Sequence, residues 1–234
     1  MIKKSIALPN SEINIVMNTQ YGSKGDILFI HGLGCSKESF NDAFTATGLS
    51  DYNLIAPDLP GFGVSSKEDN ILYEMSNQAE YLKSLLDILK INNPIIIAHS
   101  MGGAIALLLI EQLKSIRHFF CLEGNLVAED CSISRKVAAL SQDYFVNKEY
   151  IDHPLKYRCQ RLSSDPEASP VSYYKSSVSL LKLTESGKLL EKYLKLECPK
   201  TYIYGEENKN TRAVSLLEGE DLVEVDGCGH FMMT

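Results

Sequence analysis

Ser100 and His230 are the residues of this sequence whose type and setting could carry nucleophilic chemistry. Ser100 interrupts an apolar run in the stretch PIIIAHSMGGAIALLLI, and His230 follows a Gly-x-Gly turn close to the last residue. A serine hydroxyl is activated when an imidazole accepts its proton and a carboxylate orients that imidazole. The two residues therefore predict acyl-transfer chemistry, provided that the fold brings them together beside an acid.

The turn around Ser100 leaves almost no loop between a strand that ends at Ala98 and a helix that begins near Met101. Such a turn forces unusual backbone angles on its central residue and needs small neighbours, which Ala98 and Gly102 supply. Gly103 lets the helix approach the sheet closely. The turn is expected to present the Ser100 hydroxyl at the carboxyl edge of the sheet, over the positive end of a helix. The alternative is a serine that only caps that helix.

Apolar runs and helical spacing alternate along most of the chain. The runs are mostly continuous, which is typical of strands covered on both faces. Strands are expected at Ile13–Met17, Ile27–Ile30, Asn53–Ala56, Pro94–Ala98, Phe119–Leu122, Thr201–Tyr204 and Leu222–Val225. This alternation predicts an α/β fold with a mostly parallel sheet flanked by helices.

The alternation stops between Val127 and Glu197, where helical spacing continues without strands. A helical insertion between two strands of the sheet explains this stretch. We therefore expect a core made of residues 1–125 and 198–234 and a small helical insertion made of residues 126–197.

Composition and charge exclude several functions. The formal net charge of the 234 residues is −7, whereas nucleic-acid binders usually carry a basic surface, so no nucleic-acid partner is expected. No apolar run approaches the roughly 18 residues of a membrane span, and no signal segment is visible, so a cytoplasmic protein is expected. The six cysteines lie singly, and Cys228 with His230 lacks further ligands, so no metal is expected.

The motifs together resemble those of the α/β-hydrolase fold superfamily. Ala98-x-Ser100-x-Gly102 is similar to its nucleophile elbow, with alanine in place of the first glycine, and His31-Gly32-Leu33-Gly34 is similar to its oxyanion loop. The resemblance implies that the backbone N–H groups of Leu33 and Met101 bind the oxyanion and that His230 is the base. It also implies that the insertion is a lid, and that no cofactor is needed.

The acid is where this sequence departs from the resembled pattern. Many members place an aspartate after the penultimate strand, and Asn208 stands there instead. Some branches place the acid one strand earlier, where this chain has Glu123. An acidic residue at the end of an apolar strand needs a partner, and His230 would be one. Glu123 is therefore favoured over Glu207, the other candidate. A second departure is the end of the sequence four residues past His230, where members usually continue with a helix.

These features predict a serine hydrolase that cleaves an ester-type (or thioester or amide) bond of a small, partly apolar substrate. Some aromatic residues of the insertion could line the substrate pocket, but most are expected to form the core of the insertion. They are Tyr144, Phe145, Tyr150, Tyr173 and Tyr174. One alternative is a binding protein for small molecules on the same fold, with a lid that gates its site and with weak catalysis or none. Another is a nucleotide-dependent oxidoreductase, suggested only by Gly32, Gly34 and Asp58. The oligomeric state and the substrate are not predicted.

Overall fold

An eight-stranded sheet organises the structure, a computed structural model that describes residues 1–157 and 168–233. The strand order is β1-β2-β4-β3-β5-β6-β7-β8. The β1–β2 and β2–β4 pairs are antiparallel and the other five pairs are parallel, so the mostly parallel sheet expected from the sequence is confirmed. The strands are β1 (Ile2–Ala7), β2 (Asn14–Gln20), β3 (Asp26–Ile30), β4 (Asn53–Pro57), β5 (Ile95–His99), β6 (His118–Leu122), β7 (Lys200–Gly205) and β8 (Leu222–Val225).

Strand β1 was not expected from the sequence. The other seven strands lie where the apolar runs predicted them, with ends shifted by a few residues. β1 forms the edge of the sheet and pairs only with β2, through backbone hydrogen bonds from Ile2↔Thr19 to Ala7↔Asn14. Its side chains are exposed or only partly buried. An edge strand of this kind shows no clear apolar run in its sequence, because backbone pairing and not burial of side chains stabilises it.

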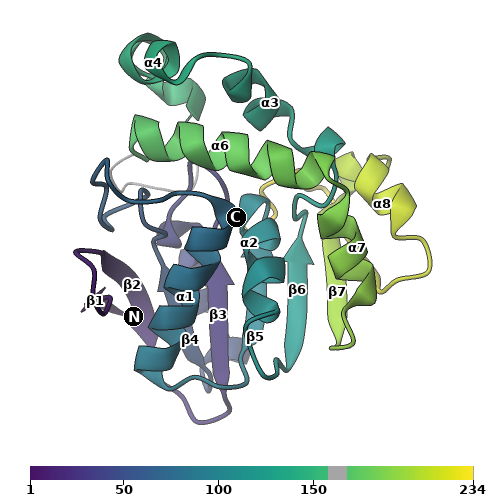
Figure 1. Cartoon of the computed structure of the whole chain (residues 1–234). Coiled ribbons are helices and arrows are strands. Elements are labelled where there is room, and N and C mark those ends of the chain that lie inside the picture. The colour runs from purple at the N-terminus through teal and green to yellow at the C-terminus, as the bar shows by residue number, and fades with distance from the viewer. Residues whose placement is uncertain (158–167, 234) are drawn as a thin grey trace.

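Helices cover one face of the sheet and form the main core with it. Figure 1 shows α1 (Met75–Leu89), α2 (Met101–Ile110) and α7 (Lys188–Lys195) in front of the strands. The opposite face has a smaller apolar cluster, in which Phe40 of η1 (Lys37–Phe44) packs on Phe29 of β3. The remaining short elements of the core are η2 (Thr47–Leu49), η6 (Glu206–Asn208) and α8 (Arg212–Leu216).

The described chain between β6 and β7 is entirely helical apart from its connections. α6 crosses above the carboxyl ends of the strands, with α3 and α4 beyond it (Figure 1). The expected insertion, residues 126–197, falls within this stretch, and its residues 158–167 lie outside the described ones. Its helices before α7 are η3 (Ala128–Asp130), α3 (Ser132–Ala138), α4 (Gln142–Tyr144), η4 (Phe145–Glu149), α5 (Tyr150–Asp152), η5 (Pro154–Tyr157) and α6 (Pro170–Glu185).

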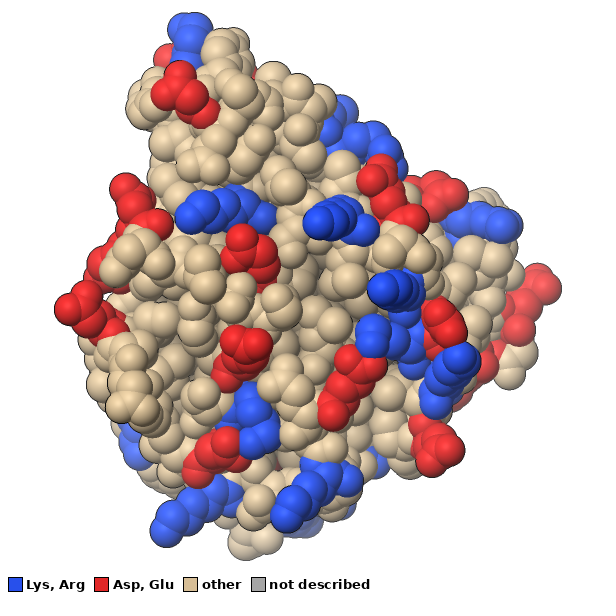
Figure 2. Space-filling model, in the orientation of Figure 1, with Lys and Arg blue, Asp and Glu red and all other residues tan. Residues whose placement is uncertain are grey.

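Acidic and basic side chains alternate over the face that α1, α2 and α7 cover. Figure 2 shows no extended patch of either sign there. Several charges are paired, as in Lys83 with Asp87 and Lys192 with Glu111. None of the helices formed by residues 1–157 and 168–233 has both the length and the apolar character that a membrane span requires.

Two glycines set the distance between α2 and the sheet. A Cβ atom on Gly102 would lie 2.4 Å from the backbone oxygen of Ile30 in β3. A Cβ atom on Gly103 would lie 2.6 Å from the Cα atom of Gly124, just after β6. Real Cβ atoms do not approach backbone atoms this closely, so α2 reaches its position only because both residues lack side chains.

Replacement of Gly102 by alanine should therefore destabilise the fold. We expect Gly102→Ala to lower the free energy of unfolding by about 1–3 kcal/mol, because the added methyl group meets backbone and not a flexible side chain. Gly48→Ala is the control, since a Cβ atom added to Gly48 would have nothing within 4 Å of it. Urea unfolding of both variants is the measurement. Equal stability of the two would show that α2 does not need the close approach.

Candidate active site

Ser100 occupies the turn between β5 and α2 with a backbone conformation that side chains rarely adopt. Its φ is 54° and its ψ is −121°. Its N–H donates to the carbonyl oxygen of Leu122 at 3.0 Å, which ties the turn to the end of β6. Such strain persists only where the surroundings fix it, and it is typical of functional sites. The strained turn brings Ser100 to the wall of a pocket at the carboxyl edge of the sheet.

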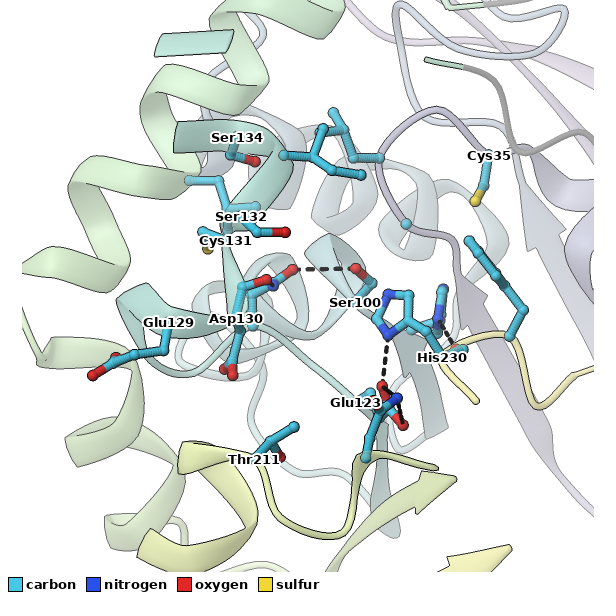
Figure 3. A pocket seen from close by; sticks show the side chains of 18 of the residues that line it. Cys35, Ser100, Glu123, Glu129, Asp130, Cys131, Ser132, Ser134, Thr211 and His230 are labelled. Carbon is cyan, nitrogen blue, oxygen red and sulfur yellow. Dashed lines mark hydrogen bonds and ion pairs between the residues drawn. The ribbon is translucent and has the colours of Figure 1, made fainter. Parts of the chain in front are cut away.

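His230 and Glu123 form a close pair in the same pocket. The Nδ1 atom of His230 lies 2.6 Å from Oε2 of Glu123, within hydrogen-bonding distance. Figure 3 shows the imidazole between the Glu123 carboxylate and the Ser100 hydroxyl, with its second nitrogen toward Ser100. The structure thus brings together three side chains that are up to 130 positions apart in numbering, from β5, β6 and the loop after β8.

The Glu123 carboxylate has two further donors. The Asn208 side-chain amide donates to both carboxylate oxygens at 2.9 Å, and the Gly205 N–H donates to Oε1 at 2.9 Å. Burial alone would raise the pKa of Glu123, but the hydrogen bonds from His230, Asn208 and Gly205 outweigh it and lower the pKa below its usual value. Glu123 is therefore held as a carboxylate beside the imidazole.

Asn208 and Glu207 take positions that sequence reasoning did not foresee. Asn208, which stands where an acid was expected, orients the Glu123 side chain instead of contacting His230. Glu207, the alternative acid, directs its carboxylate toward Gly229, since a Cβ atom there would lie 2.5 Å from its Oε2. The geometry therefore favours Glu123 as the partner of the imidazole.

His99 supports the loop that carries His230. Its Nε2 atom lies 2.8 Å from the carbonyl oxygen of His230, and the two rings are 4.6 Å apart. Nδ1 of His99 is buried and has no hydrogen-bond partner. Burial, with the nearby His230, lowers the pKa of His99 to about 3, so this ring stays neutral and donates from Nε2.

Two backbone N–H groups are available next to Ser100. A Cβ atom on Gly32 would lie 3.1 Å from that of Ser100, so the loop that carries Leu33 packs directly against the turn. Within the described part of the chain, the N–H groups of Leu33 and Met101 donate to no protein acceptor. Met101 begins α2, whose first N–H groups have no partner inside the helix. Both groups can therefore bind an anionic oxygen.

The pocket has a volume of about 470 Å³ and combines polar and apolar residues. Figure 3 shows Glu129, Asp130, Ser132 and Thr211 on one side of Ser100 and Cys35 on the other. Other residues that line it are Leu33, His99, Glu123, Asn125, Ile133, Ser134, Tyr173, Leu180, Asn208, Arg212, His230 and Phe231. A substrate here would contact hydrogen-bonding groups as well as an apolar surface.

The aromatic residues of the insertion mostly form its core. Phe145, Tyr150 and Tyr173 are buried against one another, with ring centroids 5.7–6.0 Å apart. Of the five aromatic residues singled out in the insertion, only Tyr173 lines the described pocket. The interpretation favoured from the sequence, that most of these rings form the core of the insertion, agrees with this burial, and Tyr144 remains at the surface.

Asp58 is not free to bind a ribose. It is fully buried, and its carboxylate accepts hydrogen bonds from Lys37 N–H at 2.7 Å, Lys37 Nζ at 2.9 Å and Val64 N–H at 3.0 Å. These bonds tie the loop after β3 to the loop after β4. The interpretation of Asp58 as an acid that orders its loop fits this geometry, and the interpretation as a nucleotide-binding acid does not.

Two of the buried thiols have a raised pKa, and the described residues form no cluster of metal ligands. Cys121 and Cys131 are buried, and burial raises the pKa of Cys121 to about 12 and that of Cys131 to about 11. Among residues 1–157 and 168–233, no group of three or more His, Cys, Asp or Glu side chains could hold a metal ion. Cys159 lies outside the described residues.

Sequence comparison links the chain to one family. Residues 27–234 match the model of the alpha/beta hydrolase family. The magnesium-chelatase 30 kDa subunit of Rhodobacter capsulatus is 42% identical over 82 residues, 35% of this chain and 28% of that protein. Lipase 3 of Moraxella sp. (strain TA144) is 35% identical over 104 residues, 44% of this chain and 32% of that protein. The aligned segments thus span only about a third of these relatives.

Structural comparison extends over nearly the whole chain. The haloalkane dehalogenase DbeA from Bradyrhizobium elkani USDA94 has a TM-score of 0.78 at 19% identity, covering 99% of this chain and 92% of that one. At this identity the likeness shows the fold alone.

The buried His99 should make stability depend on pH. Its pKa is about 3 in the folded protein and ordinarily 6.5, so below pH 6.5 the unfolded chain binds a proton that the folded one does not. Stability should then fall as the pH drops from 6.5 toward 3, with a slope of up to about 1.4 kcal/mol per pH unit for each such histidine. His31, also buried with a lowered pKa, adds to this slope.

We expect His99→Asn to reduce the slope of the unfolding free energy against pH between pH 6.5 and 5. The reduction should equal the contribution of one histidine, up to about 1.4 kcal/mol per pH unit. The exposed Gln112 provides the control, because its amide does not titrate and Gln112→Asn should leave the slope as it is in the unaltered protein. Urea unfolding at a series of pH values is the measurement. An unchanged slope in His99→Asn would mean that His99 is protonated in the folded state.

Proposed function

The chain belongs to the alpha/beta hydrolase family, and on this basis we propose that it is a serine hydrolase that cleaves an ester-type bond through an acyl-enzyme. The observation that carries the proposal is the 2.6 Å contact between His230 and Glu123 in the pocket where the strained Ser100 turn lies. The relative named as a lipase agrees with an ester-type bond. Thioesters and amides undergo the same chemistry and belong to the same proposal.

In the first step, the Ser100 oxygen attacks the carbonyl carbon of the substrate. Nε2 of His230 takes the hydroxyl proton, and Nδ1–H donates to Glu123, whose negative charge stabilises the imidazolium. The N–H groups of Leu33 and Met101 bind the oxyanion, and removal of one such donor raises the barrier by roughly 2.7–4 kcal/mol in well-studied sites. His230 then passes the proton to the leaving group.

In the second step, water resolves the acyl-enzyme. His230 accepts a proton from the water, which attacks the ester carbonyl, and Ser100 leaves with that proton. We infer that the helical insertion acts as a lid, because Ser132, Ile133 and Leu180 on it line the pocket above Ser100. Since both polar and apolar groups line the pocket, we propose a small substrate with both kinds of surface.

A fluorophosphonate probe should label Ser100 stoichiometrically, because the activated oxygen displaces its leaving group and remains phosphonylated. Intact-mass measurement reads the adduct, and peptide mapping locates it. We expect Ser100→Ala to abolish labelling. Ser132→Ala, which removes another hydroxyl of the same pocket, should still reach full labelling.

Another outcome of this experiment would support another function. A folded protein that takes up no probe would favour a binding protein without turnover.

The assignment of the acid can be tested by comparing two glutamates. Glu123→Gln removes the charge that stabilises the imidazolium, so we expect kcat on a p-nitrophenyl ester to fall by about 10⁴-fold with little change in folding. Glu207→Gln, a matched change in the neighbouring loop, should alter kcat by less than about threefold. Steady-state kinetics and circular dichroism are the measurements. The reverse pattern would assign the acid to Glu207.

A further inference from the structure

Asn125 is fixed against Ser100 by two of its own hydrogen bonds. Its backbone N–H donates to the carbonyl oxygen of Ser100 at 3.1 Å, and its side-chain Nδ2 donates to the carbonyl oxygen of Asp130 at 2.9 Å. Only the NH₂ end of an amide can donate to a carbonyl, so the Asp130 contact determines the orientation of the amide. Oδ1 therefore faces Ser100, and the residue is buried, with only 4% of its surface exposed.

The hydroxyl of Ser100 donates to this Oδ1 atom. The two oxygens are 3.3 Å apart, which is long for an O–H···O bond, so the hydroxyl can leave it at small cost (Figure 3). During the proposed reaction the proton goes to His230, and in the acyl-enzyme the Ser100 oxygen carries no hydrogen. Oδ1 of Asn125 then loses the donor that it has in the resting protein.

A buried carbonyl oxygen without a donor is unfavourable, so another donor in the pocket should replace the hydroxyl. We propose that Asn125 is a specificity-determining residue whose Oδ1 accepts a hydrogen bond from an N–H or O–H group of the acyl part of the substrate, close to the scissile carbonyl. This inference rests on the proposed function. It identifies the substrate class as esters of acyl groups with a donor next to the α-carbon, such as N-acylamino acids.

The groups around Asn125 agree with a donor-bearing acyl group. Ser132 and Thr211 lie on the same side of Ser100 as Asp130, the residue whose backbone oxygen holds the Asn125 amide, and both line the pocket (Figure 3). A plain alkyl chain placed there would remove the two hydroxyl groups from water and offer them no hydrogen bond.

Two isosteric esters test the inference. The p-nitrophenyl ester of N-acetylglycine carries an N–H group where the p-nitrophenyl ester of 4-oxopentanoic acid carries a CH₂ group. The ratio of their kcat/KM values, measured by p-nitrophenol release, is compared between the unaltered protein and each variant. The intrinsic reactivity of the esters cancels in this comparison, and so does a general loss of activity from a structural defect.

We expect Asn125→Leu, which removes the acceptor at similar volume, to lower the preference for the N–H ester by about 3- to 10-fold, the worth of one hydrogen bond. Asn125→Asp keeps an oxygen acceptor and should retain the preference. Asn125→Ala provides the same test as the leucine variant if that variant does not fold. Phosphonate labelling of Ser100 in each variant verifies that the nucleophile is intact.

The outcomes separate the two proposals. Suppose that the unaltered protein hydrolyses both esters and that the ratio of their kcat/KM values is unchanged in Asn125→Leu or Asn125→Ala. Asn125 then does not contribute to substrate specificity, and this inference is wrong. If the unaltered protein hydrolyses neither ester and takes up no phosphonate probe, the proposed function itself fails. If Asn125→Asp loses the preference for the N–H ester just as Asn125→Leu does, the oxygen acceptor does not explain that preference and the inference is also wrong.

Discussion

The close approach of helix α2 to the sheet is the constraint on which the rest of the site depends. Gly102 and Gly103 allow backbone-to-backbone contact with Ile30 and Gly124, and this contact leaves no room for a loop between β5 and α2. Ser100 must then take a positive φ of 54°. The same close packing sets Gly32 against Ser100. One packing arrangement therefore fixes both the position of Ser100 and that of the loop that carries the Leu33 N–H group.

The acid and the amide beside the imidazole come from neighbouring strands and have different tasks. Glu123 extends from the end of β6 and carries the charge, and Asn208 after β7 donates two hydrogen bonds to it. An amide could orient the imidazole but could not stabilise its cation, whereas it is well suited to hold a carboxylate in one rotamer. The positive φ of Glu123, 41°, indicates that the backbone is also strained to aim this side chain.

Short-range patterns made much of the fold and part of the site predictable. The turn at Ser100 and seven strands follow from local apolar runs and small residues, which act within a few positions of the chain. The hydrogen bond from Asn208 to Glu123 joins residues 85 positions apart, and that between His99 and His230 joins residues 131 positions apart. No local sequence pattern predicts contacts over such separations. Asn125 follows Glu123 by two positions, but its importance arises from the turn of the chain around Ser100. β1 escaped prediction because it buries little.

The buried pair of Lys37 and Asp58 limits how this protein can admit a ligand. Both side chains are almost inaccessible to solvent, and to separate such a pair without replacing its partners costs about 3–5 kcal/mol. A conformation in which the loop after β3 is displaced and the pair is broken would therefore be populated by fewer than about one molecule in a hundred. That wall of the cavity is therefore a rigid template for whatever binds against it.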